Sequence, residues 1–232
     1  MITFAKDTQK QDIMDIWKIS FPNDNQEFID TYFADKYKSE NTLIYLLDNK
    51  VVSCLQILPY TIEFHNYTCQ ISYISGAATL PDYKNRGIMG QLLTQSFHEM
   101  KNRGDIFTIL IPQEAWLINF YKKYGYFAHF EHFSTKIYDC SACFLDIFTF
   151  LELDNTHVRN VMTRVLNVEK ALHLYASFHN QLVINIKAQD YQIPENNGIF
   201  CLYNGNCNRK HDECFDMKLS INYLTEWLFK LS

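Results

Sequence analysis

Hydrophobic residues near the N-terminus recur at the three- and four-residue spacing of an α-helix. Ile13, Ile16 and Trp17 fall on one helical face, and Thr8 is the expected N-cap. The same spacing over residues 28–33 predicts a second short helix. Two helices are therefore expected to precede the first strand.

The spacing then changes to the apolar runs that are typical of β-strands. Residues 41–47 and 51–58 are two such runs, and the turn-forming residues 48–50 separate them. This pattern predicts a hairpin. A further strand is expected over residues 67–78.

A strand, a helix and a strand follow in order. Hydrophobic residues over 88–100 keep helical spacing as far as Gly104, which provides a left-handed stop. The apolar run 105–111 predicts a strand that a right-handed parallel crossover joins to the preceding strand. A helix over 116–124 and a closing strand over 127–138 complete a mixed α/β domain with the element order ααβββαβαβ.

A second, smaller α+β unit is predicted in the C-terminal third. Residues 139–155 follow no single periodicity and are interpreted as the connection. The fold class is therefore α+β, with a mixed-sheet domain over 1–138 and a small domain over 156–232. The elements expected in the small domain are a β stretch near 162–165, a helix over 167–178, strands over 181–187 and 198–203, and a final helix from Ser220.

Composition and charge exclude several classes of protein. Hydrophobic residues make up 47% and charged residues 20% of the 232 positions, which predicts a folded chain. The net charge of −5 removes the basic surface expected of a nucleic-acid binder. No run approaches the roughly 18 apolar residues of a membrane span, and the N-terminus lacks a signal-peptide pattern. We therefore expect a cytoplasmic protein with neither nucleic acid nor membrane as a partner.

The seven cysteines form no secreted disulfide pattern, and free thiols are expected. Cys140 and Cys143 have the spacing of a redox or zinc pair, but no second pair follows at zinc-ribbon distance. Cys207, His211 and Cys214 are separated by intervals that match no zinc-finger pattern. We therefore expect no metal site.

The segment 76–93 carries the main chemical signal. A strand ends in small residues, a short basic turn follows, and a helix begins directly. Such a turn presents unpaired N–H groups and the positive end of the helix dipole to an anion such as pyrophosphate. Gly87 and Gly90 have no side chain to block it, and Lys84 and Arg86 add positive charge. An ordinary βα turn has a similar pattern, so the turn alone leaves both interpretations open.

The segment from Thr79 to Gly90 resembles the acetyl-CoA motif of the GCN5-related N-acetyltransferase (GNAT) family. In that motif Arg or Gln, two variable residues, Gly, one variable residue, and Gly or Ala bind the pyrophosphate. Lys84 takes the place of Arg or Gln, Gly87 keeps the first Gly, and Met89 takes the second small position. Lysine keeps the charge but loses the guanidinium fork. The resemblance implies that the backbone of residues 78–80 pairs with the acetyl and pantetheine groups. The implied acetyl-CoA contacts are Ala78, Thr79, Leu80, Lys84, Asn85, Arg86, Gly87, Ile88, Met89, Gly90 and Asn119.

Residues 119–127 resemble the second signature of the same family, an Asn and a Phe-Tyr before a basic, aromatic and glycine ending. In that family the tyrosine often protonates the departing thiolate, which implies Tyr121 as the catalytic residue. Attack of an amine on a thioester releases a sulfur anion, and a phenol near the sulfur can donate a proton to it. Among 15 tyrosines a packed helical aromatic is the usual alternative, and the position of Tyr121 after the phosphate turn favours the catalytic role.

A narrower resemblance extends into the C-terminal third. Residues 160–170, 197–200 and 217–225 resemble parts of the sterol-carrier-like domain of the enhanced-intracellular-survival (Eis-like) acetyltransferases. In those relatives the chain continues to a terminal carboxylate that acts as a base, and we expect this base to be missing after Ser232. Since no acidic residue lies between Ile71 and Pro81, the strand position that carries a basic Glu in some relatives is also empty. We therefore expect the amine to lose its proton to water or to arrive neutral.

Together these resemblances imply an acetyl-CoA-dependent N-acetyltransferase that acts on a primary amine by direct transfer in a ternary complex. We expect the acceptor to be a small-molecule or peptide amine, and the acidic composition suits a cationic one. The alternative is a non-catalytic acyl-CoA-binding or lipid-carrier-like module. The small domain is expected to pack on the first domain or on a second copy in a homo-oligomer, because about 77 residues make a marginal core when isolated.

Overall fold

The computed structural model describes residues 1–129, 137–139, 161–211 and 213–230. They fall into two compact units, and each is described by itself. The first unit contains residues 1–58 and 73–99, and the second contains residues 59–72 and the described residues from 100 onward. Strands β3 and β4 each contribute residues to both units.

The elements of the N-terminal half are β1 (Ile2–Phe4), α1 (Lys10–Ser20), α2 (Gln26–Asp35), β2 (Thr42–Leu47), β3 (Lys50–Phe64), β4 (Tyr67–Thr79), α3 (Ile88–Asn102) and β5 (Phe107–Leu110). Those that follow are α4 (Ala115–Lys122), β6 (Phe127–His129), β7 (Ile137–Asp139), β8 (Val161–Val165), α6 (Val168–Phe178), β9 (Ile184–Gln189), β10 (Gly198–Tyr203), β11 (Asn206–Lys210), β12 (Met217–Ser220) and α7 (Ile221–Lys230).

In the first unit, β1, β2, β3 and β4 are hydrogen-bonded in that order, and β1 is a strand that the sequence pattern did not predict. The predicted hairpin is confirmed, because β2 and β3 pair in antiparallel fashion around a two-residue turn. Asp48 and Asn49 form that turn with φ values of 49° and 61°. Two consecutive left-handed residues are the geometry of a type I′ turn, which matches the twist of paired strands.

Helices α1 and α2 are confirmed where the helical spacing predicted them. Ile13, Ile16 and Trp17 are buried on α1, with at most 5% of any of them exposed. The expected cap is wrong, because Thr8 lies inside a 3₁₀ turn, Asp7–Gln9, that leads directly into α1. The 3₁₀ turn removes the extended residue that a side-chain cap requires.

In the second unit the sheet order is β4, β5, β8 and β6. The β5 strand is adjacent to β4, as the strand-helix-strand prediction requires, and Ile106 donates its N–H to the Gln70 carbonyl at 3.1 Å. The single closing strand predicted over 127–138 is wrong. Its two ends are separate strands, since β6 pairs with β8 and β7 pairs with β3.

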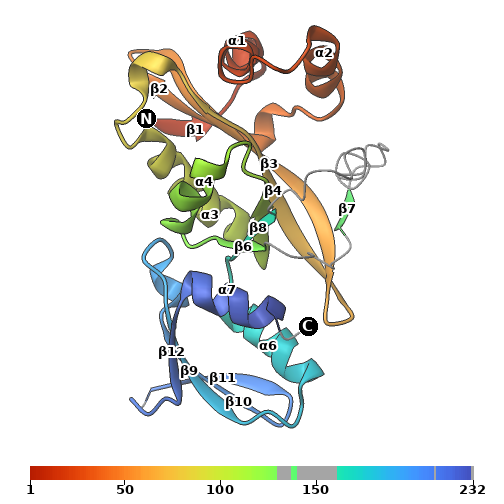
Figure 1. The fold of residues 1–232 in the computed structure, drawn as a ribbon, viewed down its shortest axis with the longest axis vertical. Helices are drawn as coiled ribbons and strands as arrows, with labels where there is room; N and C mark the ends of the chain where they lie inside the picture. The colour runs from red at the N-terminus through yellow and green to blue at the C-terminus, as the bar shows by residue number, and fades with distance from the viewer. Residues whose placement is uncertain (130–136, 140–160, 212, 231–232) are drawn as a thin grey trace. The chain divides into compact units, whose positions relative to one another are not determined.

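The C-terminal part of the second unit contains a separate four-stranded sheet in the order β11, β10, β9 and β12. Helices α6 and α7 cover one face of this sheet (Figure 1). Ile186, Phe200 and Leu202 are fully buried beneath them. The helices, β9 and β10 are confirmed, whereas β11 and β12 were not predicted.

The α+β fold class is confirmed by these elements. Most of the predicted connection, residues 140–155, lies outside the described residues, so the division into domains stays a prediction. None of the helices in the described part of the chain is both long and apolar enough to span a membrane.

Asp105, just before β5, is a carboxylic acid buried inside the second unit. The residue is 2% exposed, and its carboxyl group accepts a hydrogen bond from the Ser72 hydroxyl. Burial raises the pKa of Asp105 to about 6, against the opposing effects of the Ser72 hydrogen bond and the Arg103 charge. The folded state therefore binds this proton more tightly than the unfolded state does. Asp105 should make the protein less stable as the pH rises from about 4 to about 6.

Asp105→Asn should remove this loss of stability, because asparagine accepts the same hydrogen bond but carries no charge. Between pH 4 and pH 7.5, the unfolding free energy of the variant should rise by about 2 to 3 kcal/mol relative to wild type. Urea denaturation at both pH values measures this difference. The same substitution at the exposed Asp35 is the matched control, which should follow wild type. A difference for Asp105→Asn that does not change with pH would contradict the prediction.

Candidate functional site

The end of β4 is fixed by hydrogen bonds to β3. Leu80 donates its N–H to the Val52 carbonyl at 2.9 Å, and the Ser53 hydroxyl donates to the Ala78 carbonyl at 2.7 Å. Ser53 Oγ also lies 2.8 Å from Thr79 Oγ1. Because the backbone groups of successive strand residues point to alternate sides, the N–H and carbonyl of Thr79 point away from β3. Of the three residues expected to pair with the acetyl and pantetheine groups, Thr79 presents its backbone to the other edge of β4.

Gly76 determines the course of β4 before this end. Its φ is +55°, and a Cβ atom at this position would lie 2.4 Å from the Trp17 ring. The Trp17 ring is held in place by a 2.8 Å hydrogen bond from its Nε1 to Asp24 and by the Tyr32 ring at 4.5 Å. Only glycine combines this backbone conformation with so close an approach. An isolated glycine in a strand pattern is the sequence signal that indicates such a position.

The connection from β4 to α3 is short and contains two left-handed residues. A 3₁₀ turn, Pro81–Tyr83, is followed by the exposed Asn85 with φ +62° and by Gly87 with φ +74°. The first helical hydrogen bond of α3 runs from the Gln91 N–H to the Gly87 carbonyl at 3.1 Å. Gly87 is therefore the residue at which the turn ends and the helix begins.

The N-terminus of α3 provides a group of backbone donors. Helix geometry supplies no acceptor for the N–H groups of Gly87, Ile88, Met89 and Gly90, and the helix dipole adds about half a positive charge there. Ile88 is buried, so it offers its backbone and not its side chain. A Cβ atom on Gly87 would meet no heavy atom within 4 Å, so the space beside this backbone is open. These properties suit a phosphate or a pyrophosphate.

Basic side chains surround the same turn. Arg86 donates from Nη2 to the Asp82 carbonyl at 2.8 Å, and its guanidinium carbon lies 5.2 Å from the Tyr83 ring centroid. Lys50 places its Nζ 5.8 Å from the same ring centroid. Lys84 is exposed. Two cations on the turn and one on β3 can thus attract a negatively charged ligand.

Asn119 and Tyr121 lie on α4, in the second unit. Asn119 is exposed, whereas Tyr121 is 7% exposed. The Tyr121 ring packs against Phe120 and Tyr126, with centroids 5.2 Å and 5.7 Å away. The Tyr126 hydroxyl in turn lies 3.4 Å from Thr108 Oγ1. The first unit therefore brings the turn residues together, and the second unit holds Tyr121 in an aromatic environment.

Burial makes three of the cysteine thiols unreactive. It raises the pKa of Cys54 to about 12, of Cys69 to about 11 and of Cys207 to about 12. These thiols stay protonated near neutral pH and do not act as nucleophiles. Within the described ranges, no three or more His, Cys, Asp or Glu side chains are grouped so as to hold a metal ion. Cys140 and Cys143 lie outside those ranges.

A comparison with protein families decides the identity of the N-terminal part. The sequence profile of the acetyltransferase (GNAT) domain matches residues 2–128, which is more than half of the chain. The chain belongs to the GNAT family. The family resemblance of the two sequence motifs is therefore confirmed, and the protein is a GNAT-family acetyltransferase.

Solved structures extend the similarity of this GNAT protein to nearly the whole chain. Eis1 from Mycobacterium abscessus matches with a TM-score of 0.75 and 11% identity, over 99% of this chain and 89% of that one. A GCN5-related N-acetyltransferase from Anabaena variabilis matches with a TM-score of 0.70 and 14% identity, over 97% and 88%. One from Kribbella flavida matches with a TM-score of 0.71 and 12% identity, also over 97% and 88%. At such low identities the likeness shows the fold alone, which is Eis-like. No curated protein matches the chain.

Sequence reasoning missed two residues beside the turn of this GNAT domain. Ser53 and Lys50 lie on β3, far from the motif along the chain, and reach it because β3 lies beside the end of β4. The predicted hairpin joined residues 41–47 to 51–58 and did not indicate that β3 lies beside β4, so the sequence carried no signal for these two residues.

Proposed function

We propose that this GNAT protein transfers the acetyl group of acetyl-CoA to a primary amine by direct attack in a ternary complex. The observation that carries the proposal is the open, positively charged N-terminus of α3 at Gly87, within the region that matches the GNAT domain. The acceptor is proposed to be a small-molecule or peptide amine, and the mild net charge of −5 is compatible with a cationic one.

Both the backbone and the side chains of the turn are proposed to bind acetyl-CoA. The N–H groups of Gly87 to Gly90 are proposed to donate to the pyrophosphate oxygens, because they have no acceptor within the helix. Lys84 and Arg86 supply positive charge, and Asn85 shapes the turn through its left-handed conformation. The Thr79 backbone is proposed to hydrogen-bond the pantetheine arm, with its neighbours Ala78 and Leu80 keeping it in place. Asn119 is proposed as a further contact.

Tyr121 is proposed to donate its phenolic proton during the reaction. The amine nitrogen forms a bond to the thioester carbonyl carbon, the carbon–sulfur bond breaks, and the sulfur leaves with its electron pair. A phenol that protonates the sulfur lowers the barrier to this departure. The amine is proposed to lose its proton to water or to arrive neutral, since no acidic residue is present between Ile71 and Pro81. The nitrogen releases one further proton to water when the amide forms, and the Tyr121 phenolate regains its proton from water.

Residues 156–232 are proposed to form a docked structural domain rather than a tethered carrier. In the second unit, the His65 ring at the β3–β4 turn contacts the rings of Tyr175 and His179, with centroids 5.1 Å away in both cases. Strand β8 also pairs with β5 and β6. Without these partners, a fragment of residues 1–150 should be insoluble or less stable to urea than the full chain. A soluble fragment that is as stable and as active as the full chain would contradict the proposal.

A non-catalytic acyl-CoA-binding or lipid-carrier-like module is the alternative. The two functions differ in whether free thiol appears when acetyl-CoA and an amine are both present. A panel of primary amines, from polyamines and aminoglycosides to peptides, should be mixed with acetyl-CoA and assayed for thiol with a chromogenic disulfide. Amine-dependent thiol release together with an acetylated product supports the transferase. Tight acetyl-CoA binding with no thiol release from any amine supports the alternative.

A further inference from the structure

Arg164 on β8 and Asp190 after β9 form an ion pair inside the second unit. Arg164 Nη2 donates to both carboxylate oxygens of Asp190, at 2.8 Å and 2.9 Å. Neither side chain is exposed to solvent. A buried ion pair loses the hydration of both charges and adds little net stability, so its main effect on the fold lies in the groups that it holds in place.

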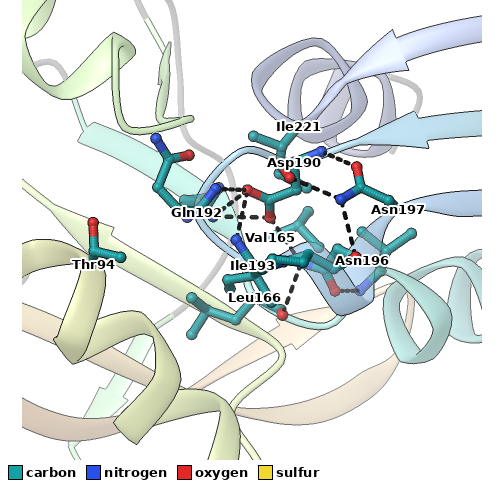
Figure 2. Close-up of polar contacts among 12 residues, drawn as sticks. Thr94, Val165, Leu166, Asp190, Gln192, Ile193, Asn196, Asn197 and Ile221 are labelled. Atoms are coloured by element: carbon teal, nitrogen blue, oxygen red, sulfur yellow. Dashed lines mark hydrogen bonds and ion pairs between the residues drawn. The ribbon is translucent and has the colours of Figure 1, made fainter.

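The Asp190 carboxylate also organises the loop that follows β9. It accepts the backbone N–H groups of Gln192 and Ile193 on Oδ1, at 3.0 Å and 3.2 Å. It accepts the Asn196 side chain on Oδ2 at 2.9 Å, and Asn196 Nδ2 also donates to the Leu166 carbonyl at 3.1 Å. Figure 2 shows Gln192, Ile193 and Asn196 arranged around Asp190. The ion pair therefore holds residues 190–196 in one conformation.

Two groups of this network contact the C-terminal end of α4. Gln192 donates from Nε2 to the carbonyl of Lys123, the C-cap residue of α4, at 3.3 Å. The guanidinium of Arg164 lies against Gly125, since a Cβ atom on Gly125 would be 2.3 Å from Arg164 Nη1. The C-terminal end of a helix carries partial negative charge and carbonyl groups without helical donors. A positive charge and an amide donor are the groups that stabilise such an end.

The C-terminal end of α4 follows directly after Tyr121 in the chain. The Tyr126 N–H donates to the Tyr121 carbonyl at 3.3 Å, and their rings are in contact. Any shift of residues 123–126 therefore moves the Tyr121 backbone and the ring that packs beside its phenol. A proton donor must be held within a fraction of an ångström of its productive position.

We propose that Arg164, Asp190 and Gln192 are positioning residues, which hold the end of α4 so that Tyr121 keeps the orientation needed for proton donation. This inference rests on the proposed role of Tyr121. The loop after β9 therefore affects kcat and leaves acetyl-CoA affinity unchanged.

Gln192→Glu is the main test, because it keeps the length of the side chain but replaces the donor with an acceptor. Asp190→Asn would leave Arg164 buried without its counter-charge, and such a variant can fail to fold. Gln192→Glu should lower kcat about 10-fold with no change in the KM for acetyl-CoA, an effect on turnover alone. Gln192→Lys restores a donor and should recover most of the activity. Asn208→Asp, the same amide-to-acid change at an exposed position of β11, should match wild type.

A double-mutant cycle separates this inference from the proposed function. In a Tyr121→Phe background, Gln192→Glu should cause no further loss of kcat, because the proton donor is already absent. Hydrogen exchange of the amides of residues 121–126 should be faster in Gln192→Glu than in Asn208→Asp, whether or not an acceptor amine is known. If Tyr121→Phe leaves kcat at the wild-type value, the role of Tyr121 fails, and this inference fails with it. Two results would overturn only this inference while Tyr121→Phe still lowers kcat. One is a Gln192→Glu variant that matches wild type in kcat or in the hydrogen-exchange rates of residues 121–126. The other is a Gln192→Glu effect on kcat that is as large in the Tyr121→Phe background as in wild type.

Discussion

Gly87→Asn should weaken acetyl-CoA binding by 100-fold or more. Asparagine tolerates the left-handed conformation that Gly87 adopts at φ +74°, so the turn should keep its shape. The new side chain would occupy the open space beside the helix N-terminus, through which the pyrophosphate is proposed to approach. Losing two charge-assisted hydrogen bonds, at about 1.5 to 3 kcal/mol each, corresponds to roughly a 100-fold or larger rise in Kd. Isothermal titration calorimetry with acetyl-CoA measures the change.

Gly205→Asn is a matched control for Gly87→Asn, because Gly205 has the same φ of +74° in the β10–β11 turn. Gly205→Asn places the same residue in the same backbone conformation, so it measures the effect of asparagine on stability alone. The acetyl-CoA affinity of this variant should equal that of wild type. Circular dichroism and thermal unfolding of both variants establish that they fold. Unchanged affinity in a folded Gly87→Asn protein would show that the pyrophosphate binds elsewhere.

Local sequence patterns predicted the elements in which buried hydrophobic residues recur at the spacing of the helix or strand itself. The helical spacing of Ile13, Ile16 and Trp17 places all three in the core of the first unit, and Asp48-Asn49 has the turn chemistry of a hairpin. Strand β11 could not be found in this way, because it is mostly polar and Cys207 is its only buried residue. Strand β12 has only four residues and is completed by parallel pairing with β9. Its stability comes from that partner and not from its own pattern.

The error over residues 127–138 has a different cause. Alternation indicates that a segment is extended, but it does not specify the strand with which the segment pairs. Phe127 to His129 pair with β8, whereas Ile137 to Asp139 pair with β3. Such a choice depends on contacts between residues far apart in the chain, which no local window contains.

The candidate site was predictable where chemistry depends on adjacent residues. A strand end, a basic turn, Gly87 and a helix start predict a set of backbone donors, because these N–H groups belong to consecutive residues. The network behind α4 was not predictable. Arg164 and Asp190 are charged residues of the kind usually found on the surface, and only the fold brings them together in the interior.

Tyr121→Phe should lower kcat about 100-fold and leave the KM for acetyl-CoA near its wild-type value, as expected for the loss of a general acid. Phenylalanine keeps the ring that packs on Phe120 and Tyr126, so the substitution removes only the hydroxyl group. Steady-state kinetics of thiol release, with a saturating amine from the panel, provide both constants. Calorimetric binding of acetyl-CoA provides an independent measure of affinity.

Tyr124→Phe is the matched control for this substitution, because it removes a phenolic hydroxyl from the same end of α4. Tyr124 is half-buried and packs on Phe120 with centroids 5.1 Å apart, and Tyr121 also packs on Phe120. A loss of turnover that is specific to Tyr121→Phe therefore assigns the effect to one hydroxyl group and not to the aromatic cluster. An equal loss of acetyl-CoA affinity and of turnover in Tyr121→Phe would instead indicate a packing role. In that case the departing sulfur must receive its proton from another donor, and the contacts of Gln192 and Arg164 with the end of α4 would serve stability alone.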